Sequence, residues 1–484
     1  MKSFAVFIFI LFTPLAMGEN LTLTGSVVIS VKQGTIDADL TLSHLPKMNN
    51  YVIFINTGMN IQYVRNEDDN VNYVYRKRYN RNYSFESFGY YLPDNTGEGM
   101  FLPDTLNFKY TGKFPVISDM QMASDYGDWK GNIAFNGKTV RADGLQAAWY
   151  PVLYDVENDK YYDSLPYDIN ITCADCESIY VNGSSPVLGA SGNFTSQQPV
   201  QLMLFAGDFD IAEREGGLFL NAGLTEQQTT EFGRVISSFE RFYEGKLGIP
   251  YGDKVVFIHT TPVSKKNNWA FVTYPTIVII NHIEGGLGAI ISDEKAEWFE
   301  PFIAHEFAHY YFGTYRVFNS ELGDMLSESF AEYLALKLTE ALVSESVYKA
   351  NIEKKLAALR GKTLTPVSEI TAASDYGDRN LYVYTYAPVI WLLLEQRIGE
   401  ANMYLWMQKL LTTASPMTNY DFLISTLDSV LKNKALLNDI KTDVFTNPNI
   451  TDSADLFWLV ISFHAPRTIS TGTLKQKSAS PALF

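Results

Sequence analysis

The sequence predicts a multidomain α+β protein, with a β-rich N-terminal domain followed by a second domain whose C-terminal part is mostly helical. Three observations predict this arrangement. Residues 21–200 alternate short apolar runs with turn signals and contain few segments that support a long helix. From residue 201 strand and helix patterns are mixed, and from about residue 343 helical patterns dominate. The 484 residues are enough for two or three domains with ample cores.

The first residues have the pattern of a secretory signal peptide. Lys2 provides the positive end, residues 4–16 form the apolar run, and Ala16-Met17-Gly18 is a small-x-small cleavage site. This run is too short to span a bilayer, and no later segment has about twenty apolar residues. We therefore expect that residues 1–18 are removed. The mature chain, without a transmembrane segment, would be exported to the periplasm or the extracellular space.

The β-rich domain is predicted to span residues 19–200. Three of its segments have the pattern of strands: Ser26–Val31, Ala38–Leu42 and Tyr51–Asn56. Asn, Gly, Ser and Thr become frequent over residues 182–196, which is typical of a domain boundary.

Cys173 and Cys176 are the only cysteines and have the spacing C-x-x-C. In an exported chain the default interpretation is a short structural disulfide. The alternative is a thioredoxin-like redox motif, which requires a following helix. The flanking residues 167–172 and 178–181 have strand patterns instead, so we predict a structural pair.

The second domain is predicted to span residues 201–465. Thr225–Lys246 has a strong helical pattern, with Thr225 as its N-cap and Gly248-Ile249-Pro250 as its stop. Two strands and two later helices are the clearest remaining elements: Lys254–His259, Thr276–Ile280, Tyr386–Ile398 and Met403–Leu411. Residues 466–484 are polar and without period, and we expect a flexible tail.

Residues 305–309 read His-Glu-Phe-Ala-His, which is the most informative motif of the chain. On a helix His305 and His309 are one turn apart and share a face, as two imidazole ligands of one zinc ion do. Glu306 lies beside them as a candidate general base. A chance match is the alternative. However, the chain has only 6 histidines, and the apolar neighbours suit a buried helix with Ser292 at its start and Gly313 at its end.

A carboxylate on a second predicted helix, residues 322–338, completes the ligand set. Eighteen residues separate His309 from Glu328, which has apolar neighbours. A buried, unpaired carboxylate is costly, and a bound cation offsets this cost. Three protein ligands leave the fourth zinc position open for water. Asp324 and Glu332 either orient the imidazoles or lie on a solvated helix face.

The runs Phe302–Gly313 and Leu326–Tyr333 resemble the aminopeptidase N family of zinc peptidases, in the gluzincin clan. The spacer before Glu328 matches that family, and the glycyl aminopeptidase family is a close second. The resemblance implies a β domain followed by a thermolysin-like catalytic domain. It also implies one zinc ion held by the two histidines and Glu328, and peptide hydrolysis with Glu306 as the base.

The resemblance assigns the catalytic tyrosine to Tyr384, within the run Tyr384–Val389. Its hydroxyl would stabilise the oxyanion together with zinc. From the residues alone, Tyr382 and Tyr386 are equal alternatives.

Asn268–Tyr274 resembles the strand that lines the family's substrate cleft, so Asn267, Asn268 and Trp269 are candidate substrate-binding residues. This chain departs from the family here. The Gly-x-Met-Glu-Asn motif falls on residues 264–268, and Asn267 replaces the glutamate that pairs with the substrate's free amino group. A neutral amide cannot supply the same charge-assisted contact, so strict aminopeptidase specificity is in question.

We therefore expect an exported zinc peptidase that acts on peptides or proteins and is aminopeptidase-like. One alternative is altered or internal cleavage specificity because of Asn267. The other is a non-catalytic relative that binds through the cleft, which the intact ligand set and base argue against. The net charge of −16 argues against nucleic acid as a partner. The sequence predicts neither the oligomeric state nor the natural substrate.

Overall fold

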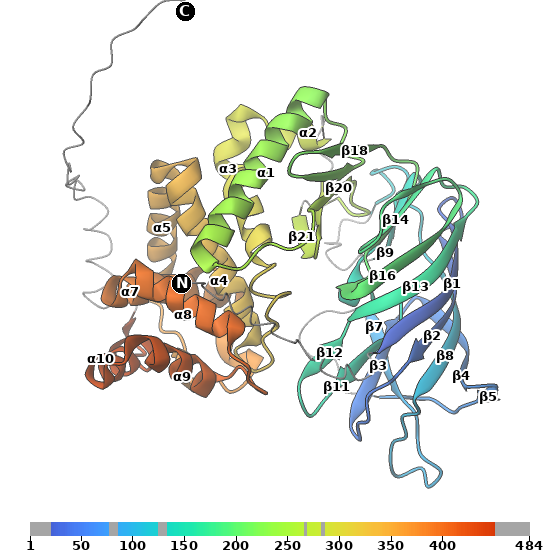
Figure 1. Ribbon diagram of the computed structural model, residues 1–484, viewed down its shortest axis with the longest axis horizontal. Coiled ribbons are helices and arrows are strands. Elements are labelled where there is room, and N and C mark those ends of the chain that lie inside the picture. Colours follow the sequence, from blue (N-terminus) through green and yellow to red (C-terminus); the bar gives the residue numbers. More distant parts are fainter. Residues whose placement is uncertain (1–20, 77–85, 124–132, 266–268, 282–285, 451–484) are drawn as a thin grey trace, which may run out of the picture.

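The computed structural model describes five stretches of the chain: 21–76, 86–123, 133–265, 269–281 and 286–450. The predicted signal peptide, the predicted tail, Asn267 and Asn268 lie outside the described residues. Within them the chain has the predicted α+β architecture. A β-rich part lies at one side and a helical part at the other, with a small sheet between them (Figure 1).

The β-rich part contains a 7-stranded sheet with the order β16-β13-β1-β2-β8-β4-β5. In sheet order its strands are Ser191–Gln201, Ser164–Cys173, Thr22–Ser30, Thr35–Ser43, Thr105–Lys113, Met59–Asn66 and Asp69–Asn70. Every second residue of β2 is buried, from Ile36 to Leu42. One face of this sheet therefore packs on the core, as the alternation in the sequence predicts.

Two five-stranded sheets complete the β-rich part. The first has the order β12-β11-β3-β7-β6, with strands Lys160–Tyr162, Val152–Asp155, Tyr51–Asn56, Ser87–Tyr91 and Val74–Tyr75. The second has the order β15-β14-β17-β10-β9, with strands Val187–Leu188, Ser178–Val181, Leu204–Gly207, Thr139–Ala142 and Ile133–Phe135. β17 pairs with β10 and β14, so residues 204–207 belong to this sheet.

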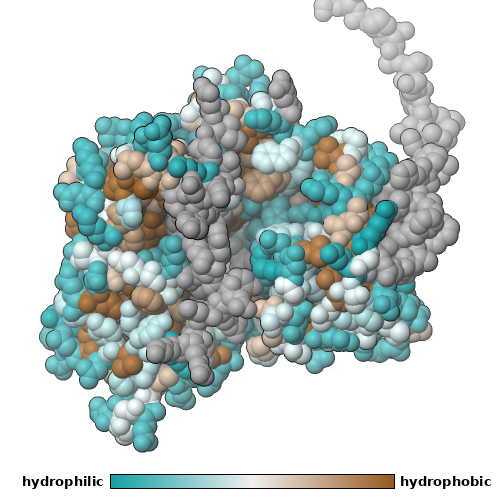
Figure 2. Space-filling view, turned by 180° about the vertical axis from the view of Figure 1, so that it is seen from behind, coloured by the Kyte–Doolittle hydropathy of each residue, from teal (hydrophilic) through white to brown (hydrophobic). Residues whose placement is uncertain are grey.

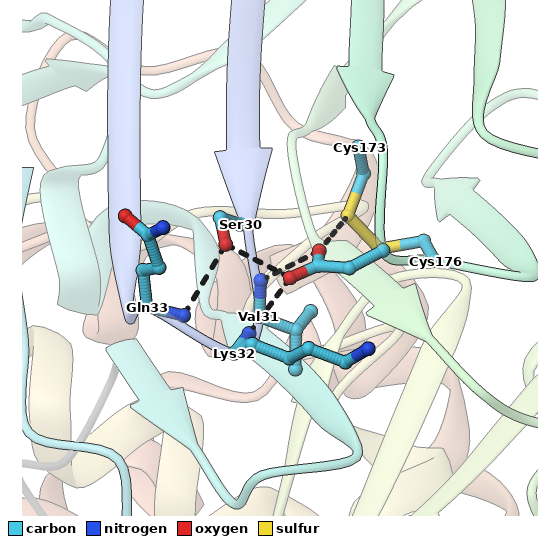
Figure 3. Close-up of a disulfide and its surroundings, with 7 residues drawn as sticks. Ser30, Val31, Lys32, Gln33, Cys173 and Cys176 are labelled. Atoms are coloured by element: carbon cyan, nitrogen blue, oxygen red, sulfur yellow. Dashed lines mark hydrogen bonds between the residues drawn. A yellow bond between two sulfur atoms is a disulfide. The ribbon is translucent and has the colours of Figure 1, made fainter.

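The two cysteines form a disulfide across the turn that follows β13 (Figure 3). Asp175, inside this turn, accepts hydrogen bonds from the Ser30 hydroxyl and from the backbone N–H groups of Val31 and Lys32. The turn after β13 is therefore joined to the turn between β1 and β2. A strand, β14, and not a helix comes directly after Cys176. The pair is therefore a structural disulfide and not a thioredoxin-like motif.

The small sheet between the two parts has the order β18-β19-β20-β22-β21. Its strands are Ile211–Arg214, Gly217–Leu220, Val256–Thr260, Thr276–Ile280 and Trp269–Thr273. All residues of β22 are buried, because side chains of the β-rich part cover one face of the sheet and helices cover the other. β21 is the edge strand of this sheet.

The helices are α1 to α10 in chain order. Their bounds are Glu226–Leu247, Gly286–Ile290, Asp293–Ala308, Gly323–Leu338, Glu345–Leu359, Arg379–Leu381, Ala387–Ile398, Glu400–Thr412, Tyr420–Leu431 and Lys434–Ile440. The predicted cap of α1 is confirmed, since Thr225 and Gln228 form a capping box and Gly248 is left-handed with φ 67°.

The helix that carries the histidine motif, α3, differs from its prediction at its end. It begins after Ser292 as expected but ends at Ala308, not next to Gly313. His309 occupies the C-cap with helical backbone angles, so the one-turn spacing from His305 is kept. Gly313 has φ 148°, and a Cβ there would lie 3.0 Å from the His309 carbonyl oxygen. Glycine therefore allows the turn after α3 to fold back against the motif.

The visible surface in Figure 2 is largely hydrophilic, with hydrophobic residues in separate patches. Among the described residues, every helix is too short or too polar to cross a membrane.

Candidate metal centre and cleft

Helices α3 and α4 pack side by side and bring three donor atoms together. The Nε2 atoms of His305 and His309 are 3.1 Å apart. Oε2 of Glu328, from α4, lies 3.4 Å from the first and 3.3 Å from the second. The three residues predicted as zinc ligands therefore point at one another. They come from two helices, and the packing of α3 against α4 brings Glu328 to the two histidines.

These separations fit zinc. Donors about 2.0–2.1 Å from a tetrahedral ion lie about 3.3 Å apart, close to all three distances. Oε2 of Glu328 is buried and makes no hydrogen bond of ordinary geometry within the described residues. Two imidazole nitrogens and one carboxylate oxygen also form a donor set that zinc prefers in catalytic sites. The residues present therefore fit a zinc ion.

Contacts behind the donors hold the imidazoles in place. Nδ1 of His305 lies 3.0 Å from Glu332 Oε2, and Nδ1 of His309 lies 3.3 Å from the Phe312 carbonyl oxygen. The Nζ of Lys355 donates to Glu332 Oε1 and to the Tyr384 carbonyl oxygen, each at 2.6 Å. Burial raises the pKa of Glu332, but Lys355 and His305 outweigh it and bring the pKa to about 2. Glu332 is therefore a partner that orients an imidazole, and not part of a solvated face.

Arg379 holds the Glu328 carboxylate in place, as Glu332 holds the His305 imidazole. Its guanidinium donates to both carboxylate oxygens of Asp324, at 2.7 and 2.6 Å, and to Glu328 Oε1 at 3.1 Å. Asp324 thus acts on the site through Arg379. The histidine motif gave no signal for Arg379 or Lys355, because neither has a fixed sequence spacing from it.

Glu306 is buried beside the donors and lines the same cleft. Burial raises its pKa, and the two imidazoles only partly oppose that rise. A carboxylate in such surroundings binds a proton more readily than one in water, which suits a group that takes up and returns a proton.

The structure distinguishes the three tyrosines of the segment 382–386. The Tyr382 hydroxyl is engaged with the Thr365 carbonyl oxygen, and the Tyr386 hydroxyl is buried in the helical core. Tyr384 lines the cleft, with its ring 5.8 Å from the His305 ring. Burial and Glu328 raise its pKa, so the phenol stays protonated at neutral pH and is able to donate a hydrogen bond.

The cleft beside these groups has a volume of about 900 Å³, near the upper end for ligand pockets. Trp269, of the edge strand β21, lines this cleft, and its role in substrate binding stays a prediction. The structure does not test the roles predicted for Asn267 and Asn268, which lie outside the described residues.

Comparison with solved structures identifies the fold. Yeast LTA4 hydrolase in complex with bestatin has a TM-score of 0.63 at 13% identity, over 88% of this chain and 67% of that chain. An M1 zinc metallopeptidase from Deinococcus radiodurans, bound to a Tyr-Ser-Ala substrate, has a TM-score of 0.59 at 16% identity, over 89% and 95% of the two chains. The fold is that of the M1 zinc metallopeptidases.

The M1 fold was the architecture that the family resemblance implied, so this prediction is confirmed. The match covers 89% of this chain, so it includes residues of both its β-rich and its helical part. No family model and no curated protein sequence matches this chain. The likeness is therefore one of structure at low sequence identity, and the chemistry must be argued from this chain's own residues.

Proposed function

We propose that this chain is a zinc-dependent peptidase, aminopeptidase-like, that hydrolyses peptide bonds. The observation that carries the proposal is the convergence of three zinc-type donors at 3.1–3.4 Å next to a buried glutamate that lines a large cleft. The M1 fold supports it, since a Deinococcus protein with this fold is a zinc metallopeptidase whose structure holds a Tyr-Ser-Ala substrate.

A zinc ion held by His305, His309 and Glu328 would supply Lewis acidity that activates water and polarises the scissile carbonyl. Glu306 takes the proton of the attacking water on its carboxylate and returns it to the nitrogen of the leaving amine. The Tyr384 hydroxyl donates a hydrogen bond to the oxygen that becomes negative. Glu332 and Arg379 keep the donor side chains oriented throughout.

A second candidate function is cleavage with altered or internal specificity. It rests on Asn267, which lacks the charge that would pair with a free amino terminus. A peptide library digested with and without a zinc chelator, and read by mass spectrometry, tests both functions. Cuts that need zinc support a peptidase. Equal cutting of free and acetylated peptides supports the second function, and strong preference for the free amine supports the first.

Replacing Glu306 by Gln tests the proton-transfer role directly. We expect the variant to bind zinc as before and to lose about 10²–10⁴-fold in kcat, because the neutral amide cannot take up a proton. Zinc content and peptide turnover are the measurements. Glu300→Gln is a matched control, since Glu300 lies on α3 and is partly buried. Unchanged turnover in Glu306→Gln would exclude Glu306 as the base.

We also propose that the chain is exported. The N-terminal pattern of residues 1–18 and the disulfide support this, because disulfides persist mainly outside the cytosol. N-terminal sequencing of the protein recovered from the periplasm or the medium tests the proposal. An uncleaved chain that stays in the cytosol would contradict it.

A further inference from the structure

The side chain of Lys355, on α5, is held between two segments of the proposed site. It is 13% exposed. Its Nζ donates to Glu332 Oε1 and to the Tyr384 carbonyl oxygen, each at 2.6 Å. Glu332 lies 23 residues before Lys355 in the sequence, and Tyr384 lies 29 residues after it. Lys355 therefore joins α4 to the turn that carries Tyr384.

The contact with Glu332 connects Lys355 to the proposed metal site. The other oxygen of this carboxylate, Oε2, lies 3.0 Å from His305 Nδ1. A carboxylate that contacts an ammonium group with one oxygen and an imidazole with the other is fixed at both ends. A continuous series of polar contacts thus runs from His305 on α3 through Glu332 on α4 to Lys355 on α5.

The contact with Tyr384 lies where the sequence removes a backbone donor. In an α-helix the Tyr384 carbonyl would accept a hydrogen bond from the N–H of the residue four positions later. That residue is Pro388, which has no N–H. Tyr384 also lies within a π-helical turn, Tyr382–Tyr386, where the regular pattern of helical hydrogen bonds is interrupted. The Lys355 Nζ supplies a donor to the Tyr384 carbonyl at this interruption.

The backbone of this turn determines where the Tyr384 ring lies. The ring centre is 5.8 Å from that of the His305 ring. Because the carbonyl and the side chain belong to one residue, a shift of the backbone moves the phenol as well. A hydrogen-bond donor that acts in a transition state must be placed closely, and a displacement of about 1 Å can cost about 10²-fold in rate. A contact that fixes the Tyr384 backbone therefore bears directly on the proposed chemistry.

We propose that Lys355 is a positioning residue that sets the place of the Tyr384 phenol relative to the His305 imidazole. It binds the backbone of Tyr384 with the same ammonium group that binds the carboxylate behind His305. Lys355 acts on the reaction through these two partners. The effect on catalysis rests on the proposed function, whereas the placement of the Tyr384 ring is measurable without turnover.

Replacing Lys355 by Met keeps an apolar stem and removes the donor. At saturating zinc we expect kcat for peptide hydrolysis to fall about 10- to 100-fold with little change in KM, because the phenol acts in the transition state. Lys355→Arg, which keeps a charged donor, should recover part of the loss. Lys349→Met, which removes a 37% exposed lysine of the same helix, is the matched control and should keep full activity.

A double-mutant cycle separates positioning from a general effect on packing. In the Tyr384→Phe background no hydroxyl remains to be placed, so Lys355→Met should lower kcat by no more than about 3-fold. Equal losses in both backgrounds would overturn the inference. If Lys355→Met alone is unstable, because Glu332 has lost its cation, Glu332→Gln is added to remove both charges. The cycle is then measured in that background, with the same two outcomes.

Fluorine NMR of a fluorotyrosine placed at position 384 reports on the surroundings of the ring without turnover. Its resonance should move in Lys355→Met, return towards the wild-type position in Lys355→Arg, and stay in place in Lys349→Met. An unmoved resonance in folded Lys355→Met would overturn the inference even if wild type hydrolyses peptides. A moved resonance in a zinc-bound protein that hydrolyses no peptide would overturn the proposed function and retain the placement of Tyr384 by Lys355.

Discussion

At the level of single residues, Arg379 connects Glu328, the carboxylate of the proposed metal site, to the rest of the site. It forms a two-pronged ion pair with Asp324, contacts Glu328 Oε1 at 3.1 Å, and its guanidinium lies 5.6 Å from the centre of the Tyr384 ring. A planar guanidinium held on one side by a carboxylate offers its remaining N–H groups in a fixed direction. Arg379 therefore determines which way Glu328 faces.

Replacing Arg379 by Ala should weaken zinc binding. We expect a loss of about 10- to 100-fold in affinity, because Glu328 would be free to turn away from the imidazoles. Competition with a chromophoric chelator at constant pH measures this loss. The zinc affinity of Arg379→Lys should lie between those of wild type and Arg379→Ala, since an ammonium group supplies the charge without the two parallel N–H groups of a guanidinium. Unchanged affinity in a folded Arg379→Ala variant would show that Glu328 is held by other contacts.

Removing the Tyr384 hydroxyl should slow the chemical step. For Tyr384→Phe we expect kcat to fall about 10²–10³-fold with little change in KM, since the hydrogen bond to the oxyanion forms only in the transition state. Tyr386→Phe is the matched control, because the Tyr386 hydroxyl is buried away from the cleft. Steady-state kinetics give kcat and KM for both variants. An equal loss in both variants would assign the effect to packing.

At the level of secondary-structure elements, side-chain hydrogen bonds join strands that are distant in the sequence. Asp175 joins the turn after β13 to the turn after β1. Asp163, between β12 and β13, accepts a hydrogen bond from the Gln201 side chain at the end of β16. Because burial dominates there, the pKa of Asp163 rises from 3.8 to about 6. The folded chain therefore holds a proton on Asp163 more tightly than the unfolded chain does.

This difference makes stability depend on pH. The contribution of Asp163 is complete below about pH 4 and is lost as the pH rises through about 6, because the partly buried carboxyl must then ionise. Asp163→Asn should raise the free energy of unfolding by about 1–2 kcal/mol at pH 7 and change it little at pH 4. Urea unfolding at both pH values measures this. Asp168→Asn, on the exposed side of β13, is the control. Equal effects of Asp163→Asn at both pH values would contradict the assignment.

At the level of the whole molecule, the β-rich part and the small central sheet share a buried core. Ten apolar residues from both sides form it: Tyr180, Met203, Phe205, Phe209, Leu220, Val256, Ile258, Phe271, Val278 and Ile280. Asn182 lies beside this core. Its side-chain amide donates to the carbonyl oxygens of Gln201, Thr273 and Tyr274. The β-rich part therefore supports the turn between the edge strand β21 and β22, and through it the cleft wall.

The shared core predicts that the two parts unfold together. Asn182→Ala would leave buried carbonyl oxygens without donors, and we expect it to cost about 3 kcal/mol. Urea unfolding followed by two probes, one in each part, measures this cost and the cooperativity. Asn193→Ala, at an exposed position of the edge strand β16, is the control and should cost little. Separate transitions in wild type would show that the parts are independent.

The shared helix face of the two histidines and the neighbouring position of Glu306 could be predicted from the sequence because their geometry is local, whereas Glu328 is predicted from its apolar neighbours and the family's spacing. Two histidines four residues apart share a helix face whatever surrounds the helix, and the strand and helix patterns follow from the same short-range periodicity. The end of α3 at Ala308 could not be predicted in this way, because the turn up to Gly313 is shaped by its contacts with His309 and Ser327.

Packing between segments that are distant in the sequence determined the contacts around the predicted ligands. Arg379 meets Glu328 across 51 residues, and Lys355 meets Glu332 across 23, so neither partner leaves a periodic signal. The same holds for the cleft, which is lined by residues of both α3 and α4. Local backbone geometry thus determined that the two imidazoles and Glu306 share one helix. Long-range contacts, which depend on the free energy of the whole packed chain, brought Glu328 to the imidazoles and determined how the side chains of the proposed site are held.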